Sequence, residues 1–479
     1  PSKTFLYLTE LIYDAARAEA MGVSFGKPRI DLKVLRTWKA NVIDQMANGL
    51  VSLNNRRGIQ LLKGRVAFES SDTVRVYDSE VSHIKFRHAI LATGSQPIPF
   101  PNTTFSVGGR IMSSTGALAL TDIPEKLLVL GGGYVGLELG TVYATLGSRV
   151  SLVELEDRLL AGVDQDLVQP LHRRLDNLFE NIHLKTRVVS MAENKNGVDV
   201  TFEGDIDTPQ QTFDKVLVAI GRKPCSRNLG LGNTKVIRDE RGFVAVDDRQ
   251  RTADERIFAV GDVIGGMMLA HKATREGKVA AEVIAGEPSA FDVRAMPAVV
   301  YTDPQIAWCG LTEEQARAEN RDISIQRFPW KFSGRAATMG ATEGLTKVIV
   351  DPTTGRVLGV GARGRQTPVL CIEVRGKLSP VDTERVHFDL LQLAQAHAMM
   401  VQARKQINDL LPETARAGIQ CHFTMKAGAP DREIVRYARR HRDIVLTVYD
   451  GAAPGSSEKE DSRGGQDIAE IIRQHLEIP

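Results

Sequence analysis

One stretch, residues 126–157 (KLLVLGGGYVGLELGTVYATLGSRVSLVELED), constrains the fold of this chain more than any other. It opens on the apolar run Leu127–Leu130, whose length and composition predict a buried strand. A glycine-rich turn and a helical pattern follow, and a second predicted strand, Arg149–Val153, ends in Glu154. Strand, glycine turn, helix, strand and terminal acid together are the fingerprint of a dinucleotide-binding βαβ unit.

Each glycine of the Gly-x-Gly-x-x-Gly turn has a physical task. Gly131 permits the tight turn, Gly133 lets the backbone approach a pyrophosphate, and Gly136 lets the helix pack closely on the strand. Free N–H groups at the helix start, where the helix dipole is positive, would hold that pyrophosphate. Glu154 would accept hydrogen bonds from an adenosine ribose and would repel a 2′-phosphate, so the sequence predicts NAD rather than NADP.

Length and composition bound the remaining possibilities. The chain of 479 residues is long enough for about three domains, and its 42% apolar content is enough for their cores. A net charge of +2 gives no excess that would favour nucleic acid or an acidic membrane as a partner. The sequence has neither an apolar run of membrane-span length nor a signal-peptide pattern, so it predicts a cytoplasmic protein. The cysteines are too widely spaced for a zinc site or a CxxC redox pair, and no metal is predicted: Cys225, Cys309, Cys371 and Cys421.

Short elements are predicted on both sides of the dinucleotide unit. Apolar spacing predicts helices over 1–21 and 31–53, and strands over 59–63, 64–70, 73–77 and 84–92. The last of these strands runs into Thr93-Gly94, where glycine would let the backbone approach a ligand. A further strand, 256–260, ends in Gly261-Asp262, which places a carboxylate at a strand end where it can bind a sugar-like hydroxyl; a helix is expected over 273–285.

Several segments resemble the pyridine nucleotide–disulfide oxidoreductases, and among them the dihydrolipoamide dehydrogenases. The resemblance covers roughly residues 1–362 and is carried by PSK, RTWKANVIDQMANGL, AILATGSQPIPFP, LLVLGGGYVGLELG, VLVAIGRKP, RTADERIFAVGDVIGGMMLAHKATREGKVAAEVIAG, AVVYTDPQIAWCGLTEEQA and FPWKFSGRAATMG. It implies a Rossmann-like α/β fold with two dinucleotide-binding domains and a partial α+β interface domain. It also implies FAD and NAD as cofactors, oxidation of free or protein-bound dihydrolipoamide, a homodimer, and a possible place in a 2-oxo acid dehydrogenase complex.

The same resemblance implies a division into domains. The expected parts are a partial FAD-binding domain (1–113), an NAD-binding Rossmann domain (114–235), a second FAD-binding segment (236–293), a partial dimerisation domain (294–364) and a separate α/β domain (366–479).

Individual site residues are carried over from the resemblance. Lys3 and Glu138 match a pair that lies beside the flavin where hydride passes, and Asp262 matches the residue that holds the ribityl chain of the flavin. His271 is expected to have a structural role. The other residues expected to bind a cofactor are Thr93, Gly94, Gly221, Gly261, Leu269 and Ala270.

Two family patterns are absent from this sequence. In the family, PSK follows a CxxxxC redox disulfide and the first FAD-binding βαβ unit, and a His-Pro-Thr segment with a nearby Glu supplies an acid–base pair. Neither pattern occurs here. The sequence therefore predicts that this chain does not turn over dihydrolipoamide, because the thiolates and the histidine base of that chemistry are not in it.

Residues 366–479 depart from the family. Alternating strand and helix patterns predict a doubly wound α/β domain, and EIVRYARRHRDIVLTVYD with DIAEIIRQHLEIP resembles a partial universal stress protein domain. Gly451, Gly455 and Gly465 echo the nucleotide loop of that family, although the composition of the segment favours a flexible loop. An NAD(P)-linked diaphorase or transhydrogenase, a non-catalytic nucleotide-binding fusion and a composite of two incomplete units remain alternatives.

Overall fold

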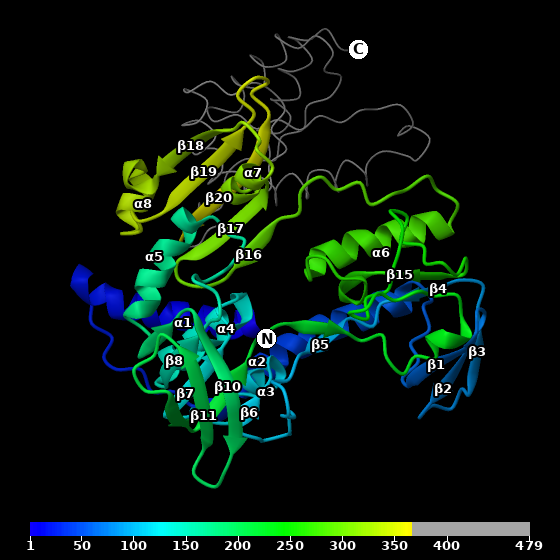
Figure 1. Cartoon of the computed structure of the whole chain (residues 1–479), viewed down its shortest axis with the longest axis horizontal. Coiled ribbons are helices and arrows are strands. Elements are labelled where there is room, and N and C mark those ends of the chain that lie inside the picture. The colour runs from blue at the N-terminus through cyan, green and yellow to red at the C-terminus, as the bar shows by residue number, and fades with distance from the viewer. Residues whose placement is uncertain (366–479) are drawn as a thin grey trace, which may run out of the picture. The chain divides into compact units, whose positions relative to one another are not determined.

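The structure is a computed structural model that describes residues 1–365, all of which belong to one compact unit, Pro1–Thr383 (Figure 1). The stress-protein-like domain expected over 366–479 lies outside the described residues. In the described part of the chain, the helices are too short or too polar to cross a membrane.

The dinucleotide unit folds as a five-stranded parallel sheet with the order β6-β13-β7-β8-β9. Its strands are β6 (Ile111–Met112), β7 (Lys126–Leu130), β8 (Arg149–Val153), β9 (Asn181–His183) and β13 (Lys215–Val218), and its helices are α3 (Ser114–Ala119), α4 (Tyr134–Leu146) and α5 (Gln165–Asp176). The strand–turn–helix–strand prediction for this stretch is confirmed. Leu127, Leu128 and Val129 are fully buried, as a strand covered on both faces requires.

The first helix packs against this unit. α1 (Ser2–Arg17) contacts α4, and Phe5 of α1 belongs to the same buried apolar cluster as Leu137 of α4. A short 3₁₀ turn, η1 (Ala18–Met21), follows α1, and the helical segment ends at Gly22, which has a φ of 87°. α2 (Leu32–Arg56) begins after Asp31, whose carboxylate accepts hydrogen bonds from the N–H groups of the first turn.

A second parallel contact joins β4 (Ala89–Leu91) to β15 (Ile257–Ala259), with α6 (Ala270–Ile284) following in the chain. Two small antiparallel sheets complete this part of the molecule: β1 (Arg65–Ser70), β2 (Thr73–Tyr77) and β3 (His83–Lys85), and β5 (Ser95–Pro97) with β14 (Arg222–Pro224). A third antiparallel sheet packs against the dinucleotide unit and comprises β10 (Thr186–Glu193), β11 (Val198–Gly204) and β12 (Gln210–Phe213). The 3₁₀ turns here are η2 (Leu231–Asn233) and η3 (Gly261–Ile264).

Two strand predictions for this part need correction. Residues 59–63 form no regular strand; Ile59 and Leu61 are exposed, and the described residues offer this segment no paired neighbour. Residues 84–92 do not form one continuous strand, because β3 pairs with β2 while β4 pairs with β15. The apolar run therefore serves two sheets, and Phe86 at the break packs edge-to-face on Phe68.

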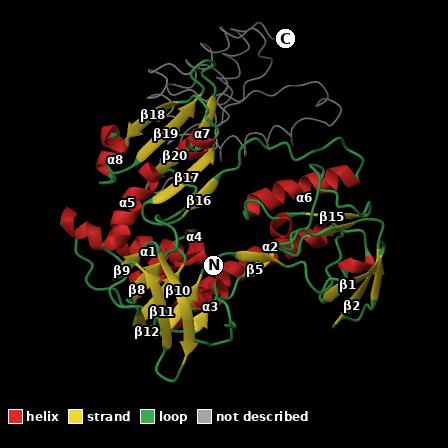
Figure 2. Ribbon diagram, viewed as in Figure 1, coloured by secondary structure: helices red, strands yellow, loops and turns green. Residues whose placement is uncertain are grey.

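The last described part is a five-stranded antiparallel sheet with the order β16-β17-β20-β19-β18 (Figure 2). Its elements are β16 (Ala298–Val300), β17 (Gln305–Gly310), α7 (Glu313–Ala318), β18 (Ser324–Pro329), η4 (Trp330–Phe332), α8 (Gly334–Thr338), β19 (Leu345–Val350) and β20 (Val357–Gly364). α5 approaches β20 closely: a Cβ added at Gly361 would lie 2.6 Å from Cδ1 of Leu167. This sheet therefore packs against a helix of the dinucleotide unit.

Candidate cofactor-binding site

The glycine turn between β7 and α4 has the geometry of an anion cradle. Gly131 has a φ of 110°, and a Cβ there would lie 2.6 Å from the carbonyl oxygen of Ala219. A Cβ on Gly136 would collide with the carbonyl of Gly131, so the helix can lie this close to the turn only with glycine at that position. Gly133 is exposed, and a Cβ there would meet no atom within 4 Å. α4 begins after Gly133 without a side-chain cap, which leaves its first N–H groups available for a ligand.

Glu154, at the end of β8, is oriented toward this turn. Its Oε2 accepts a hydrogen bond from the N–H of Gly132 at 2.6 Å, and its Oε1 accepts one from the N–H of Glu156 at 2.9 Å. Each carboxylate oxygen can accept more than one hydrogen bond, so Glu154 keeps capacity for a ligand.

The strand order fixes where a ligand of this sheet would lie. β7 has β8 on one side and β13 on the other, so the sheet reverses direction of growth at β7. Ligands of open parallel sheets bind at the carboxyl ends of the strands at such a point. Gly221, with a φ of 130°, follows β13 at this edge, and the N–H of Ala219 donates to the carbonyl of Leu130 at 2.8 Å.

Lys3 and Glu138 form an ion pair between α1 and α4. The Nζ of Lys3 lies 2.8 Å from Oε1 and 2.7 Å from Oε2 of Glu138. Glu138 is only 3% exposed, which rules out the solvent-facing position that its place on the helix left open. The N–H of Tyr301 donates to Oε1 of Glu138 at 3.0 Å, and the Tyr301 ring lies under the Lys3 ammonium, 4.3 Å from it.

A second group of predicted residues meets at the carboxyl ends of β4 and β15. Asp262 accepts a hydrogen bond from Oγ of Ser95 at 2.5 Å, and the guanidinium of Arg222 donates to the same Oγ at 2.7 Å. Thr93 donates to the carbonyl of Cys225 at 2.7 Å. Gly94, with a φ of 72°, has open space where a Cβ would lie. Carboxylate, hydroxyl and open backbone at one sheet edge fit a polyhydroxyl chain.

The start of α6 borders this edge. Leu269 is the residue before the helix and Ala270 is its first residue, and the helix start has no side-chain cap. Gly261, with a φ of 79°, lies on the turn that carries Asp262. Nε2 of His271 lies 2.7 Å from the carbonyl oxygen of Pro297, in keeping with a structural role.

Tyr134 is a residue that the sequence did not single out. It follows Gly133, and burial raises the pKa of its hydroxyl; Arg222 opposes the rise, while the charges of Asp262 and Glu138 add to it. The pKa of the Tyr134 hydroxyl therefore depends on charged residues of both groups described above. The sequence signal that could have found it is its position inside the glycine turn.

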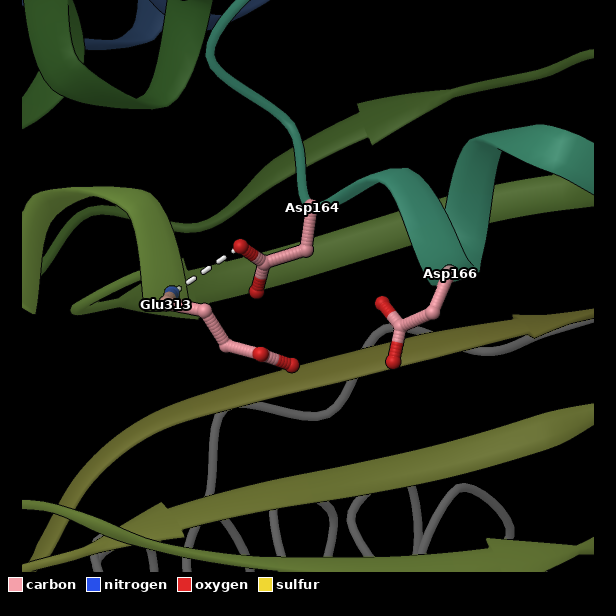
Figure 3. A group of neighbouring side chains, drawn as sticks. All are labelled: Asp164, Asp166 and Glu313. Atoms are coloured by element: carbon pink, nitrogen blue, oxygen red, sulfur yellow. Dashed lines mark hydrogen bonds between the residues drawn. The ribbon is translucent and has the colours of Figure 1, made fainter. Parts of the chain in front are cut away.

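Asp164, Asp166 and Glu313 form a compact acidic group outside this site (Figure 3). The chain supplies the cation at its centre: Nζ of Lys347 lies 2.6 Å from Asp164, 2.7 Å from Asp166 and 3.0 Å from Glu313. Lys347 is fully buried. We call these four residues the Lys347 cluster; it joins α5 to the antiparallel sheet.

Sequence comparisons agree with this geometry. Residues 3–277 match the family described as pyridine nucleotide-disulphide oxidoreductase, and residues 296–374 match the dimerisation domain of that family. The dihydrolipoyl dehydrogenase of Vibrio cholerae is 40% identical over 369 residues, which cover 76% of this chain and 77% of that protein. Dihydrolipoyl dehydrogenase 2 of Haloarcula marismortui is 40% identical over 379 residues, covering 78% of this chain and 80% of the relative.

Solved structures show the same fold. LpdA from Mycobacterium tuberculosis is 25% identical with a TM-score of 0.69, covering 76% of this chain and 79% of that one. The flavoprotein disulfide reductase RclA from Escherichia coli is 25% identical with a TM-score of 0.65, covering 89% and 87%. The chain therefore belongs to the pyridine nucleotide-disulphide oxidoreductase family and is an oxidoreductase that uses FAD and NAD.

Proposed function

We propose that this protein is of the dihydrolipoamide dehydrogenase type, in which electrons pass from dihydrolipoamide through FAD to NAD, and that the residues of this sequence serve the FAD and NAD part of that path. The relatives at about 40% identity that carry this name support the substrate. Bound FAD would supply the group that exchanges hydride with the nicotinamide. The residues of this chain would bind both cofactors, orient them and set the charge around them.

Gly131, Gly133, Gly136 and Glu154 would hold NAD. The uncapped start of α4 offers N–H donors and a positive dipole to the pyrophosphate. Glu154 would accept from the ribose hydroxyls, and its negative charge disfavours the 2′-phosphate of NADP. Gly221 would line the same edge from the side of β13.

FAD would lie along the ends of β4 and β15. Asp262 is half-buried and already hydrogen-bonded to Ser95, so its carboxylate is held in place before a ligand arrives. We assign it to the ribityl hydroxyls. Thr93, Gly94, Gly261, Leu269 and Ala270 would complete this side of the flavin site.

The observation that carries the proposal is the pair Lys3–Glu138. The helix that opens the NAD turn carries Glu138, and its partner Lys3 comes from the first helix of the chain. The half-exposed ammonium of Lys3, held by a buried carboxylate, supplies a positive charge, and we propose that it faces the flavin and the nicotinamide. Such a charge would stabilise negative charge that develops on a ring during hydride transfer.

Assembly and location are also part of the proposal. The dimerisation domain supports a homodimer, and the dihydrolipoyl dehydrogenase relatives suggest service in a 2-oxo acid dehydrogenase complex in the cytoplasm. We propose domain boundaries near residues 113, 235, 293 and 364.

The test uses the full chain loaded with FAD. Dihydrolipoamide-dependent formation of NADH would support the dehydrogenase and would overturn the prediction, made from the absent CxxxxC and His-Pro-Thr patterns, that this chain does not turn over dihydrolipoamide. NADH-dependent reduction of a dye without any reaction of dihydrolipoamide would favour the second candidate, a diaphorase. That candidate rests on the site described above: its residues fit the flavin and the nicotinamide, while Cys225 and Cys309, the cysteines among the described residues, are not disulfide-bonded.

A further inference from the structure

Two charged residues of α6 contact the turn that carries Asp262. Lys272 is 9% exposed and Glu276 is 1% exposed. The Nζ of Lys272 lies 2.5 Å from Oε1 of Glu276. Their spacing in the sequence is that of an ordinary helix pair, and neither residue is needed for the hydride transfer proposed above.

The pair holds both ends of the turn between β15 and α6. The N–H of Gly261 donates to Oε2 of Glu276 at 2.8 Å, and Nζ of Lys272 donates to the carbonyl of Gly265 at 3.0 Å. Both glycines have positive φ values, 79° and 82°. Asp262 therefore lies on a turn that glycine makes possible and that two buried side chains tie down at each end.

Helix stability does not explain this arrangement. Removing two charges from water carries a large desolvation penalty, and apolar residues of similar volume often serve as well or better. Helix pairs of this spacing are also more favourable with Glu preceding Lys, the reverse of the order found here. What the charges do provide is a donor and an acceptor for backbone groups of the turn that would otherwise be buried without partners.

The same helix contains a control pair. Lys278 and Glu282 have the same residue types, order and spacing, but lie 3.5 Å apart with side chains that are 65% and 32% exposed. Glu282 accepts a hydrogen bond from Ser289, beyond the end of the helix, rather than from the turn. Sequence spacing alone cannot distinguish the two pairs; burial against the turn does.

We propose that Lys272 and Glu276 are positioning residues that hold the turn Gly261–Gly265, and with it Asp262, in the geometry that binds the polyhydroxyl chain of the flavin. This inference rests on the assignment of Asp262 to FAD in the proposed function. Asp262 is then held from two sides, by Ser95 on β5 through its side chain and by α6 through the backbone of the neighbouring Gly261. Binding groups held this way lose less freedom when the ligand arrives.

The test compares Glu276→Gln with Glu282→Gln in the full chain. FAD affinity is measured by quenching of flavin fluorescence, and deuterium exchange is followed in a peptide that spans Gly261–Gly265. We expect Glu276→Gln to weaken FAD affinity by about tenfold, the loss of one charge-assisted contact, and to speed exchange in that peptide. Glu282→Gln should change neither, and NADH affinity should stay the same in both variants.

A second variant guards against misfolding. If Glu276→Gln does not fold by circular dichroism, Lys272→Met, which frees only the carbonyl end of the turn, is measured against Lys278→Met. A folded variant with unchanged FAD affinity and unchanged exchange would overturn the inference. If the unsubstituted chain bound NADH but no FAD, the flavin assignment in the proposed function would fail, and the role of the pair in binding would fall with it.

Discussion

Two lysines of this molecule each neutralise buried carboxylates, yet their surroundings differ sharply. The side chain of Lys347 is 1% exposed and is bonded by three acidic residues at once. The side chain of Lys3 is 51% exposed and is bonded by Glu138 alone, with the ring of Tyr301 beneath it. Both join segments that are far apart in the sequence.

This difference shows that the charge of Lys347 stabilises the fold, whereas the charge of Lys3 is accessible to a ligand. The three donors of the Lys347 ammonium are all used by carboxylates of the chain, so this cation has no hydrogen bond left to offer a ligand. Lys3 keeps donor capacity and faces solvent on one side, which is the condition for meeting a cofactor. The comparison predicts that stability depends mainly on Lys347 and that cofactor chemistry depends mainly on Lys3.

The largest effect is expected from Lys347→Met. Removing the ammonium leaves three carboxylates close together with only Arg327 to pair with two of them, and breaking a buried ion cluster in this way typically costs about 3–5 kcal/mol. The free energy of unfolding, measured by urea denaturation, should fall by that amount, while the NADH affinity of the folded fraction should not change. Lys278→Met, at an exposed lysine, is the control and should lie within about 0.5 kcal/mol of the unsubstituted protein. Equal stability of Lys347→Met and Lys278→Met would show that the Lys347 cluster does not stabilise the fold.

Lys3→Met should affect the rate of flavin reduction more clearly than it affects stability. Glu138 stays buried but keeps its hydrogen bond from the N–H of Tyr301, so the loss of stability should be about 1–3 kcal/mol, less than for Lys347→Met. The rate at which NADH reduces the bound flavin should fall about tenfold, equivalent to roughly 1.4 kcal/mol in the transition state. Rapid-mixing absorbance of the flavin measures this rate. If Lys3→Met lost as much stability as Lys347→Met while NADH reduced its flavin at the normal rate, Lys3 would have a structural role rather than a role in cofactor chemistry.

The pH dependence of stability gives a second test of the Lys347 cluster. Burial alone would raise the pKa of Asp166, but hydrogen bonds from Lys347 and Arg327 outweigh it and lower that pKa. Burial alone would lower the pKa of Lys347, but its hydrogen bonds to Asp164, Asp166 and Glu313 outweigh it and raise that pKa. The contribution of Asp166 is present above its unfolded pKa of about 3.9 and is lost as pH falls through the lower folded value. The contribution of Lys347 is complete below about pH 10.4 and is lost as pH rises through the higher folded value.

The stability difference between the unsubstituted protein and Lys347→Met should therefore narrow at both extremes of pH, in acid as Asp166 is protonated and in alkali as Lys347 is deprotonated. Urea denaturation at a series of pH values tests this. A difference that changes through neutral pH would mean that some other group titrates with the cluster.

The smallest effect is expected at Tyr301. Its ring lies against a half-exposed ammonium, an arrangement worth about 0.5–1 kcal/mol. Tyr301→Leu keeps the N–H bond to Glu138 but loses the ring, so flavin reduction by NADH should slow two- to fivefold, roughly the same energy. Tyr301→Phe keeps the ring and should match the unsubstituted protein. Similar rates in both variants would show that the ring does not orient Lys3.

Local patterns predicted the parts of the fold that local physics determines. The strand–turn–helix–strand unit follows from contiguous apolar runs and from glycines at fixed offsets, and β7, α4 and β8 lie where expected. The strands ending at Thr93 and Asp262 were recognised for the same reason, although the structure divides the first of them. Residues 59–63 show the limit of this reasoning, because a strand needs a partner that the segment itself does not specify.

Long-range charge placement could not be predicted in this way. Lys347 and Asp164 are 183 positions apart, and nothing around either residue indicates the other. The pair Lys3–Glu138, separated by 135 positions, was expected only through the family resemblance. Lys272 and Glu276 have ordinary helix spacing, and only their burial distinguishes them from Lys278 and Glu282.

A single titration tests whether the glycine turn and Glu154 bind NAD. NADH and NADPH are titrated, with nucleotide fluorescence as the signal, into the unsubstituted chain, Glu154→Ala and Glu156→Ala. We expect the unsubstituted chain to prefer NADH. We expect Glu154→Ala to lose about tenfold in NADH affinity together with that preference, and Glu156→Ala, at an exposed neighbour, to lose neither. A chain without measurable NADH affinity, or a Glu154→Ala variant that binds NADH as before, would contradict this assignment.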